Sequence, residues 1–298
     1  MNGNHALQGH ALAMFTELVW GTTFVSTKVL LRAFTPLEIM IARFALGFLA
    51  LLIAGKGLMK AQKKSHEVLF ALAGLTGVTL YFLMENIALT YISASLVGVI
   101  VAAAPLFTAL VAAVVLREKL SRWFFLGFVC AMAGVAMASL AGVSELNLDP
   151  RGVLLGVGAA FVWGVYSVIV RKLGAVGYRT VPLTCRIFGY GLLFLLVPAL
   201  LEGFPAPLSA WTEPLHIANL LFLGLLASAT CFVTWNRAVF LLGLVKTSAY
   251  IYATPVITIV SSAIVLHETM TPVMWLGTAL ALAGLILSEH KEKEKAAG

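Results

Sequence analysis

Ten long apolar runs, separated by short polar breaks, occupy more than two thirds of the 298-residue chain. About 20 consecutive apolar residues suffice for a helix to cross the hydrocarbon core of a bilayer. Hydrophobic residues make up 61% of the chain and charged residues only 11%, so a water-soluble fold would have too few charges to cover its surface. The composition excludes disordered, collagen-like and disulfide-rich secreted proteins. It predicts an all-α integral membrane protein with ten transmembrane helices.

The predicted spans follow the apolar runs between polar breaks. They cover residues 11–31, 35–54, 68–91, 93–116, 122–141, 152–172, 180–201, 216–241, 246–266 and 272–288. Fourteen Lys and Arg residues fall on the side of the two termini, and three, Lys28, Arg32 and Arg151, fall on the other. Cytoplasmic loops carry an excess of Lys and Arg, so we expect both termini in the cytoplasm. The net charge of +7 then serves orientation rather than nucleic-acid binding.

The two halves of the chain repeat each other at a constant offset. Trp20-Gly21 matches Trp163-Gly164 at an offset of 143, and beyond the seventh span the offset becomes 150. Further matched pairs are Lys28 with Arg171, Arg43 with Arg186, Asn86 with Asn236, Pro105 with Pro255, and Glu118 with Glu268. Such a series predicts two repeats, 11–141 and 152–288, followed by a cytoplasmic tail at 289–298. Because each repeat holds an odd number of spans, the second is inverted relative to the first, as in many transporters.

The residues also resemble a known group of proteins. The first repeat reads ELVWGTTFVSTK and IALTYISASLVGVIVAAAPLFTALVAAVVLREKLS, and the second ends ATPVITIVSSAIVLHETMTPVMWLGTALALAGLIL. Together these segments resemble the drug/metabolite transporter superfamily, specifically its ten-span group with two EamA-type domains. The resemblance implies a multi-pass carrier of small metabolites or drugs, often an exporter, in the bacterial inner membrane.

Four ionisable side chains fall well inside the predicted spans. Glu17 and Glu85 are candidate groups for binding substrate or protons, because a charge inside a membrane is costly unless it is paired or faces water. Arg43 and Arg186 are expected to pair with acids and join helices. Their depths along the spans match Glu85 with Arg43 and Glu17 with Arg186. We expect at least one of the two acids to remain unpaired and to face a cavity.

Aromatic and amide side chains form the second group of candidates. Trp20, Tyr81, Trp163, Tyr166, Tyr250 and Tyr252 lie too deep for an interfacial belt, and Asn86 and Asn236 are repeat-matched. A cavity lined by aromatic rings suits amphipathic or cationic small molecules. The alternatives are core packing for the rings and helix-to-helix hydrogen bonds for the amides. Pro105 and Pro255 are candidate hinges, because a proline inside a span removes a backbone hydrogen bond.

These observations favour a secondary transporter that exports a small organic metabolite or drug by alternating access, with protons as a possible coupling ion. A facilitator or channel-like permease without ion coupling is the alternative. An enzyme is disfavoured, because the only aspartate is Asp149 in a loop and no HExxH motif occurs. The chain lacks a GxxxxGK[ST] motif, so ATP is not expected to drive it. No cofactor, metal or nucleic acid is expected; the expected partners are the substrate and the lipid bilayer, with protons as a candidate coupling ion.

Overall fold

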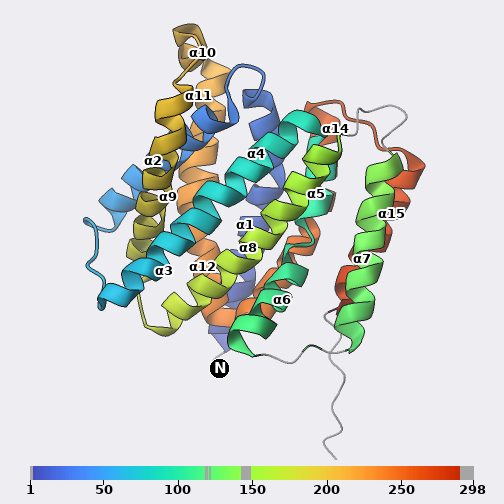
Figure 1. Cartoon of the computed structure of the whole chain (residues 1–298), viewed down its shortest axis with the longest axis horizontal. Helices are drawn as coiled ribbons and strands as arrows, with labels where there is room; N and C mark the ends of the chain where they lie inside the picture. The colour runs from blue at the N-terminus through green and yellow to red at the C-terminus, as the bar shows by residue number, and fades with distance from the viewer. Residues whose placement is uncertain (1–2, 118–119, 121, 142–148, 289–298) are drawn as a thin grey trace, which may run out of the picture.

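In the computed structural model, the described residues are 3–117, 120, 122–141 and 149–288; they form helices and no strand. The first half contains α1 (Gly3–Leu30), α2 (Pro36–Ala54), α3 (Lys64–Gly74), η1 (Leu75–Leu80), α4 (Tyr81–Tyr91), α5 (Ala94–Val101), α6 (Ala104–Leu116) and α7 (Arg122–Ala141). The second contains α8 (Pro150–Ala175), α9 (Thr180–Glu202), α10 (Leu208–Thr212), α11 (Pro214–Leu221), η3 (Phe222–Thr230), α12 (Cys231–Leu242), α13 (Leu244–Ser248), η4 (Ala249–Ala253), α14 (Thr254–Val265) and α15 (Pro272–Ser288). Figure 1 shows them as a helical bundle, with α10 at the end opposite the N-terminus.

The lengths and apolar character of the helices confirm the predicted all-α membrane fold. Seven helical stretches among the described residues are long and apolar enough to cross a membrane, and Arg122–Ala138 and Pro272–Leu287 are shorter apolar helices. The remaining predicted span corresponds to α1, which has 28 residues and begins at Gly3 rather than at residue 11. The predicted tail at 289–298 and the repeat-matched Glu118 lie outside the described residues.

Local sequence signals set the ends of several helices. At the start of α2, Thr35 and Glu38 form a reciprocal capping box, and Pro36 occupies the first turn. Asp149 accepts from the backbone of Arg151 at the start of α8, and Ser93 accepts from the backbone of Leu96 at the start of α5. These side chains satisfy backbone N–H groups that a helix leaves unpaired at its first turn.

The third span of each half contains a π-helical stretch. Helices α3, η1 and α4 run on without a loop, and so do α11, η3 and α12; the π-helical segments are η1 and η3. These segments occur at repeat-matched positions, because 75–80 plus the offset of 150 gives 225–230, within η3. π-Helical turns widen a helix by an extra residue and are frequent at functional sites.

The two halves are interleaved rather than side by side. Helix α1 packs on α12 and α14 of the second half, whereas α8 packs on α4, α5 and α6 of the first. The last helices of the two halves, α7 and α15, pack against each other along their length, at one edge of the view in Figure 1. Gly134, Gly277 and Gly284 face the partner backbone there so closely that a Cβ atom would collide with it. These small residues therefore join the two halves within one chain.

The two candidate hinge prolines lie beside a helix break, which differs from the expectation of a continuous span. Helix α5 ends at Val101 and α6 begins at Ala104, so Pro105 occupies the first turn of α6. Pro255 likewise occupies the first turn of α14, after the 3₁₀ segment η4. At such a position the missing N–H would have no helical partner in any case. The prolines therefore begin a new helix without removing an internal hydrogen bond, and their role as hinges stays a prediction.

Candidate functional site

A small cavity lies between the two halves, lined by α1, α2, α4, α5 and α6 of the first and by α8, η4 and α14 of the second. Its volume is about 40 Å³, which is room for a few water molecules. The lining residues are Glu17, Trp20, Thr23, Phe24, Arg43, Tyr81, Phe82, Glu85, Val101, Ala104, Trp163, Ile251 and Thr254. Five of the sequence-predicted candidates, Glu17, Trp20, Tyr81, Glu85 and Trp163, are thus brought together although they lie on three different helices.

Glu17 is almost fully buried, with 1% of its surface exposed. Thr254, the first residue of α14, donates a hydrogen bond from Oγ1 to Glu17 Oε2 at 2.7 Å. Within the described chain, Glu17 Oε1 is buried without a hydrogen-bond partner. The Glu17 carboxyl is therefore held by one hydroxyl from the other half, and none of the described cationic side chains lies at hydrogen-bond distance from it.

Glu85 and Arg43 face the same cavity but do not form a close ion pair. Both are buried, and among the described residues Glu85 Oε1 and Arg43 Nη1 have no hydrogen-bond partner. The Arg43 Nε donates to Ser228 Oγ at 3.0 Å, and its guanidinium carbon lies 4.3 Å from the ring centroid of Phe82. Tyr81 lies one turn before Glu85 on α4 and lines the same cavity.

Aromatic rings form the wall between the two halves. The rings of Trp20 and Trp163 pack edge to face with centroids 5.4 Å apart, and Tyr81 lies 4.9 Å from Trp163. The Trp20 Nε1 donates to the carbonyl oxygen of Ala227 at 2.8 Å, which fixes the ring. Such rings present π-faces to which a cationic ligand is attracted.

Five other sequence-predicted candidates lie outside this lining. Tyr166 is buried behind Trp163, 5.0 Å between ring centroids, and Tyr252 packs with the cluster around α7. Tyr250 forms a hydrogen bond with His10 at 2.7 Å. Asn86 donates to the Pro36 carbonyl oxygen at 3.4 Å, and Asn236 donates to Thr184 Oγ1 at 3.1 Å. The two amide contacts join helices, α4 to α2 and α12 to α9.

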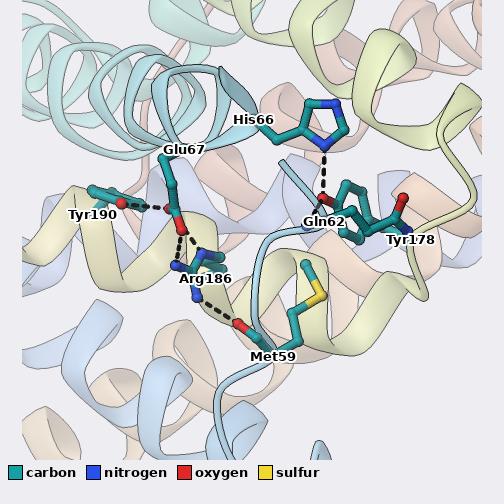
Figure 2. A network of polar contacts seen from close by, with 7 residues as sticks. All are labelled: Met59, Gln62, His66, Glu67, Tyr178, Arg186 and Tyr190. Carbon is teal, nitrogen blue, oxygen red and sulfur yellow. Dashed lines mark hydrogen bonds and ion pairs between the residues drawn. The ribbon is translucent and has the colours of Figure 1, made fainter. Parts of the chain in front are cut away.

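Arg186 is not beside Glu17, contrary to the pairing expected from depth alone. Its guanidinium forms an ion pair with Glu67 at the start of α3, and it donates to the Met59 carbonyl oxygen. Figure 2 shows this network, in which the Tyr190 hydroxyl also donates to Glu67 Oε2 at 2.6 Å. The depth of a residue along its span does not say in which direction its side chain points around the helix axis. That direction determines the partner of Arg186.

A second cluster in Figure 2 lies beside the first but does not share a hydrogen bond with it among the residues drawn. Tyr178 forms a hydrogen bond with His66 Nδ1 at 2.8 Å and accepts one from the backbone N–H of Gln62 at 2.8 Å. These contacts join the loop after α8 to the loop after α2 and to the first turn of α3.

Sequence reasoning missed several lining residues. Thr23, Phe24, Phe82, Val101, Ala104, Ile251 and Thr254 line the cavity, and none of them is ionisable. Three of them had a usable signal: Phe82 matches Phe232 at the offset of 150, and Ala104 and Thr254 directly precede the matched prolines Pro105 and Pro255. In the described part of the chain, no group of three His, Cys, Asp or Glu side chains is arranged to hold a metal ion.

Comparison with known proteins gives consistent matches over most of the chain. The profile of the EamA-like transporter family matches residues 7–140 and 150–289. A "Probable terminal-alkyne amino-acid exporter" of Streptantibioticus cattleyicolor is 30% identical over 282 residues, covering 93% of this chain and 92% of the relative. An uncharacterised transporter of Archaeoglobus fulgidus is 27% identical, covering 96% of this chain and 98% of that protein. A solved crystal structure with 20% identity covers 97% of both chains at a TM-score of 0.66, which is similarity of fold alone.

Proposed function

The chain belongs to the EamA-like transporter family, and we propose that it exports a small amino-acid-like metabolite by alternating access, in exchange for protons. The family makes it a multi-pass membrane transporter of the drug/metabolite superfamily. The substrate class, the direction and the coupling are the proposed part.

The observation that carries this proposal is a set of charged groups of both signs with unpartnered polar atoms around one cavity. Among the described residues, Glu17 Oε1, Glu85 Oε1 and Arg43 Nη1 are buried without a hydrogen-bond partner. Buried polar atoms are usually satisfied, so three together favour a ligand that supplies the missing bonds. A zwitterion supplies these bonds. Its ammonium group would bind one of the two carboxyls and contact the Trp20 and Trp163 rings, and its carboxylate would bind Arg43.

The name of one relative supports the same class of substrate. The relative from Streptantibioticus cattleyicolor is named as a probable exporter of a terminal-alkyne amino acid. An amino acid with a slender apolar side chain fits the aromatic and aliphatic walls formed by Phe24, Val101 and Ile251. The polar atoms of the cavity would bind its α-amino and α-carboxyl groups.

The size of the cavity supports alternating access. A volume of about 40 Å³ is far below the roughly 300 Å³ or more of typical small-molecule sites. The helices that line the cavity must therefore move apart before a substrate enters. The interleaved packing of α1 and α8 on the opposite halves gives two sets of helices that rock around the fixed site.

The two carboxyls support proton coupling. Glu17 and Glu85 are buried, and neither is within hydrogen-bond distance of a cationic side chain among the described residues. Burial of an unpaired carboxylate is costly, so each acid is stabilised either by a proton or by a substrate ammonium group. Competition between the two for one carboxyl would drive substrate out as protons move in.

The decisive experiment is substrate flux in proteoliposomes across an imposed pH gradient. A radiolabelled aliphatic amino acid should be exchanged faster than a dicarboxylate or a quaternary cation lacking a carboxylate. Glu17→Gln or Glu85→Gln should remove gradient-driven accumulation while substrate exchange survives, because Gln keeps the shape but carries no proton. Glu213→Gln, at an exposed loop position, is the matched control and should behave as wild type.

The competing function is a facilitator without ion coupling. It would be supported if Glu17→Gln and Glu85→Gln proteins both still concentrate substrate to the wild-type level with the gradient, or if wild-type flux ignores pH. A channel would show no saturation and no counter-transport. Absence of flux for every amine-bearing compound would contradict the substrate class.

The direction depends on the orientation, which the Lys and Arg count predicts. A cysteine replacing Ala61 in the loop after α2 should be protected from an impermeant thiol reagent in intact cells. A cysteine replacing Ser209 in α10 should react. The reverse pattern would place the termini outside and would contradict export.

A further inference from the structure

We propose that Glu268 and Lys28 close an outer gate formed by α5 and α14, one helical turn from the substrate cavity. The gate rests on the transport function proposed above, since only a carrier must close its cavity on one side. "Outer" denotes the side that bears α10 and the loop after α14.

Glu268 fastens the second half to the first. It follows α14 in the chain, yet both carboxylate oxygens bind the start of α5 in the other half. Oε1 accepts from the backbone N–H of Ala94 at 3.0 Å, and Oε2 accepts from the N–H and the hydroxyl of Ser95 at 3.1 and 2.7 Å. A carboxylate at this place satisfies N–H groups left unpaired by the helix and opposes the positive end of its dipole.

Lys28 binds the end of α4, the helix that precedes α5. Its Nζ donates to the carbonyl oxygens of Leu89 and Ile92, where α4 ends and the turn into α5 begins. A cation at the C-terminal end of a helix is stabilised by the dipole. The short turn between α4 and α5 is therefore held from two sides, by Lys28 on α1 and by Glu268 from the second half.

Below these contacts the helices themselves meet closely. Gly98 of α5 faces Thr258 of α14, and a Cβ atom at Gly98 would lie 2.9 Å from the Thr258 side chain. The Thr258 hydroxyl donates to the Gly21 carbonyl oxygen of α1 at 2.8 Å. Three helices thus pack without space between them at the level just outside the cavity.

A hollow on the outer side shows how thin this barrier is. Lys28, Arg32, Leu89 and Glu268 help to line a space of about 350 Å³. Phe24 lines the inner cavity and Lys28 lines the outer hollow. These residues are four positions apart on α1, which is about 6 Å along the axis at 1.5 Å per residue. Separation of α5 from α14 would join the two spaces.

The corresponding helix start in the other repeat differs in sequence, and Glu118, which matches Glu268, lies outside the described residues. Gly243 stands where the first half has the capping Ser93, and Val245 stands where it has Ser95. Two hydroxyls that stabilise the start of α5 are therefore missing from the start of α13. Helices α13 and η4 also pack much less extensively on α6 than α5 does on α14. The described contacts of Glu268 thus hold α5 and α14 together on the side opposite the predicted cytoplasmic face.

The test measures access to the cavity and needs no substrate. A cysteine replaces Val101, which lines the cavity, in a variant whose three native cysteines are changed to alanine. An impermeant maleimide is added outside intact cells, and the labelling rate is followed. Glu268→Gln should raise that rate about tenfold, because one amide cannot accept from all three donors. Ser95→Ala removes a single hydrogen bond and should raise it about two- to threefold.

Matched measurements separate a gate from a general loosening. Glu213→Gln, an exposed acid on the same side, should leave the rate unchanged, and size-exclusion profiles should match. An unchanged rate in Glu268→Gln, an equal rise in Glu213→Gln, or a rise only for reagent added from the cytoplasmic side would overturn the gate. If Glu268→Gln does not fold, Ser95→Ala decides alone. Failure of amino-acid flux would refute the proposed substrate and leave this measurement unaffected.

Discussion

Arg43 on α2 and Arg186 on α9 occupy matched positions of the two repeats, yet their surroundings differ. Arg43 lines the cavity with 1% of its surface exposed and binds only Ser228 by hydrogen bond among the described residues. Arg186 lies at the edge of the bundle, in an ion pair with Glu67. One guanidinium is left with free bonding capacity, and the other is fully engaged.

The difference comes from the acids, which are not duplicated. The position matched to Glu67 is Ile217, and the position matched to Glu85 is Trp235. After a duplication the same arginine therefore faces a different neighbour in each half. A repeat preserves a position, but whether that position becomes a binding group or a structural one depends on the partners that the repeat does not preserve.

Replacing each arginine in turn tests this comparison most directly. Arg43→Gln should lower the transport rate by about tenfold to 150-fold, because a hydrogen bond to a charged group contributes about 1.5–3 kcal/mol. Arg186→Gln should leave transport within about threefold of wild type. Initial rates in proteoliposomes at matched protein content give both values. Equal losses in the two variants would mean that Arg43 is structural as well.

A smaller effect is expected from the residue that orients Arg43. Ser228→Ala removes the hydroxyl that accepts from Arg43 Nε and should lower transport about three- to fivefold, since a neutral partner contributes about 1 kcal/mol. The matched position in the first repeat is Val78, so a small apolar residue is already tolerated there. Substrate affinity, measured by competition, should fall while the amount of folded protein stays constant.

The Glu67–Arg186 pair should instead contribute to the stability of the folded protein. The exposed fractions of the two side chains are 33% and 19%, so solvent screens their attraction, and we expect a coupling of about 0.5–1 kcal/mol. Arg186→Gln, Glu67→Gln and the double variant form the cycle, read by thermal unfolding in detergent. The same cycle with Arg43 and Glu85 should give a smaller coupling, and the opposite order would refute the comparison.

The smallest effect concerns the tyrosine in the same network. Tyr190→Phe removes one hydrogen bond to Glu67, which corresponds to about 0.5 kcal/mol and an unfolding temperature about 1–2 °C lower. Transport should not change. A loss of transport in this variant would show that the network in Figure 2 communicates with the cavity.

The sequence predicted the helices far better than the partners of their side chains. Apolar run length is a strong signal because a bilayer leaves no other way to satisfy the backbone, and α2 at Pro36–Ala54 agrees with the predicted 35–54 to one residue. The lining of the cavity required the direction of each side chain around its helix. Ile251 and Thr254 line the cavity because η4 and α14 both pack on α1, and the apolar pattern of the sequence does not record that packing.

The glycine contact between α7 and α15 has a consequence for biosynthesis. These helices are the last of their respective halves, and their backbones touch through Gly134, Gly277 and Gly284. Chains are synthesised and inserted in order from the N-terminus. Helix α7 therefore has no partner in the membrane until α15 has been synthesised and inserted. The bundle can thus be closed only by its final helix, and a nascent protein interrupted before that point would present an uncovered row of small residues to the quality-control machinery of the membrane.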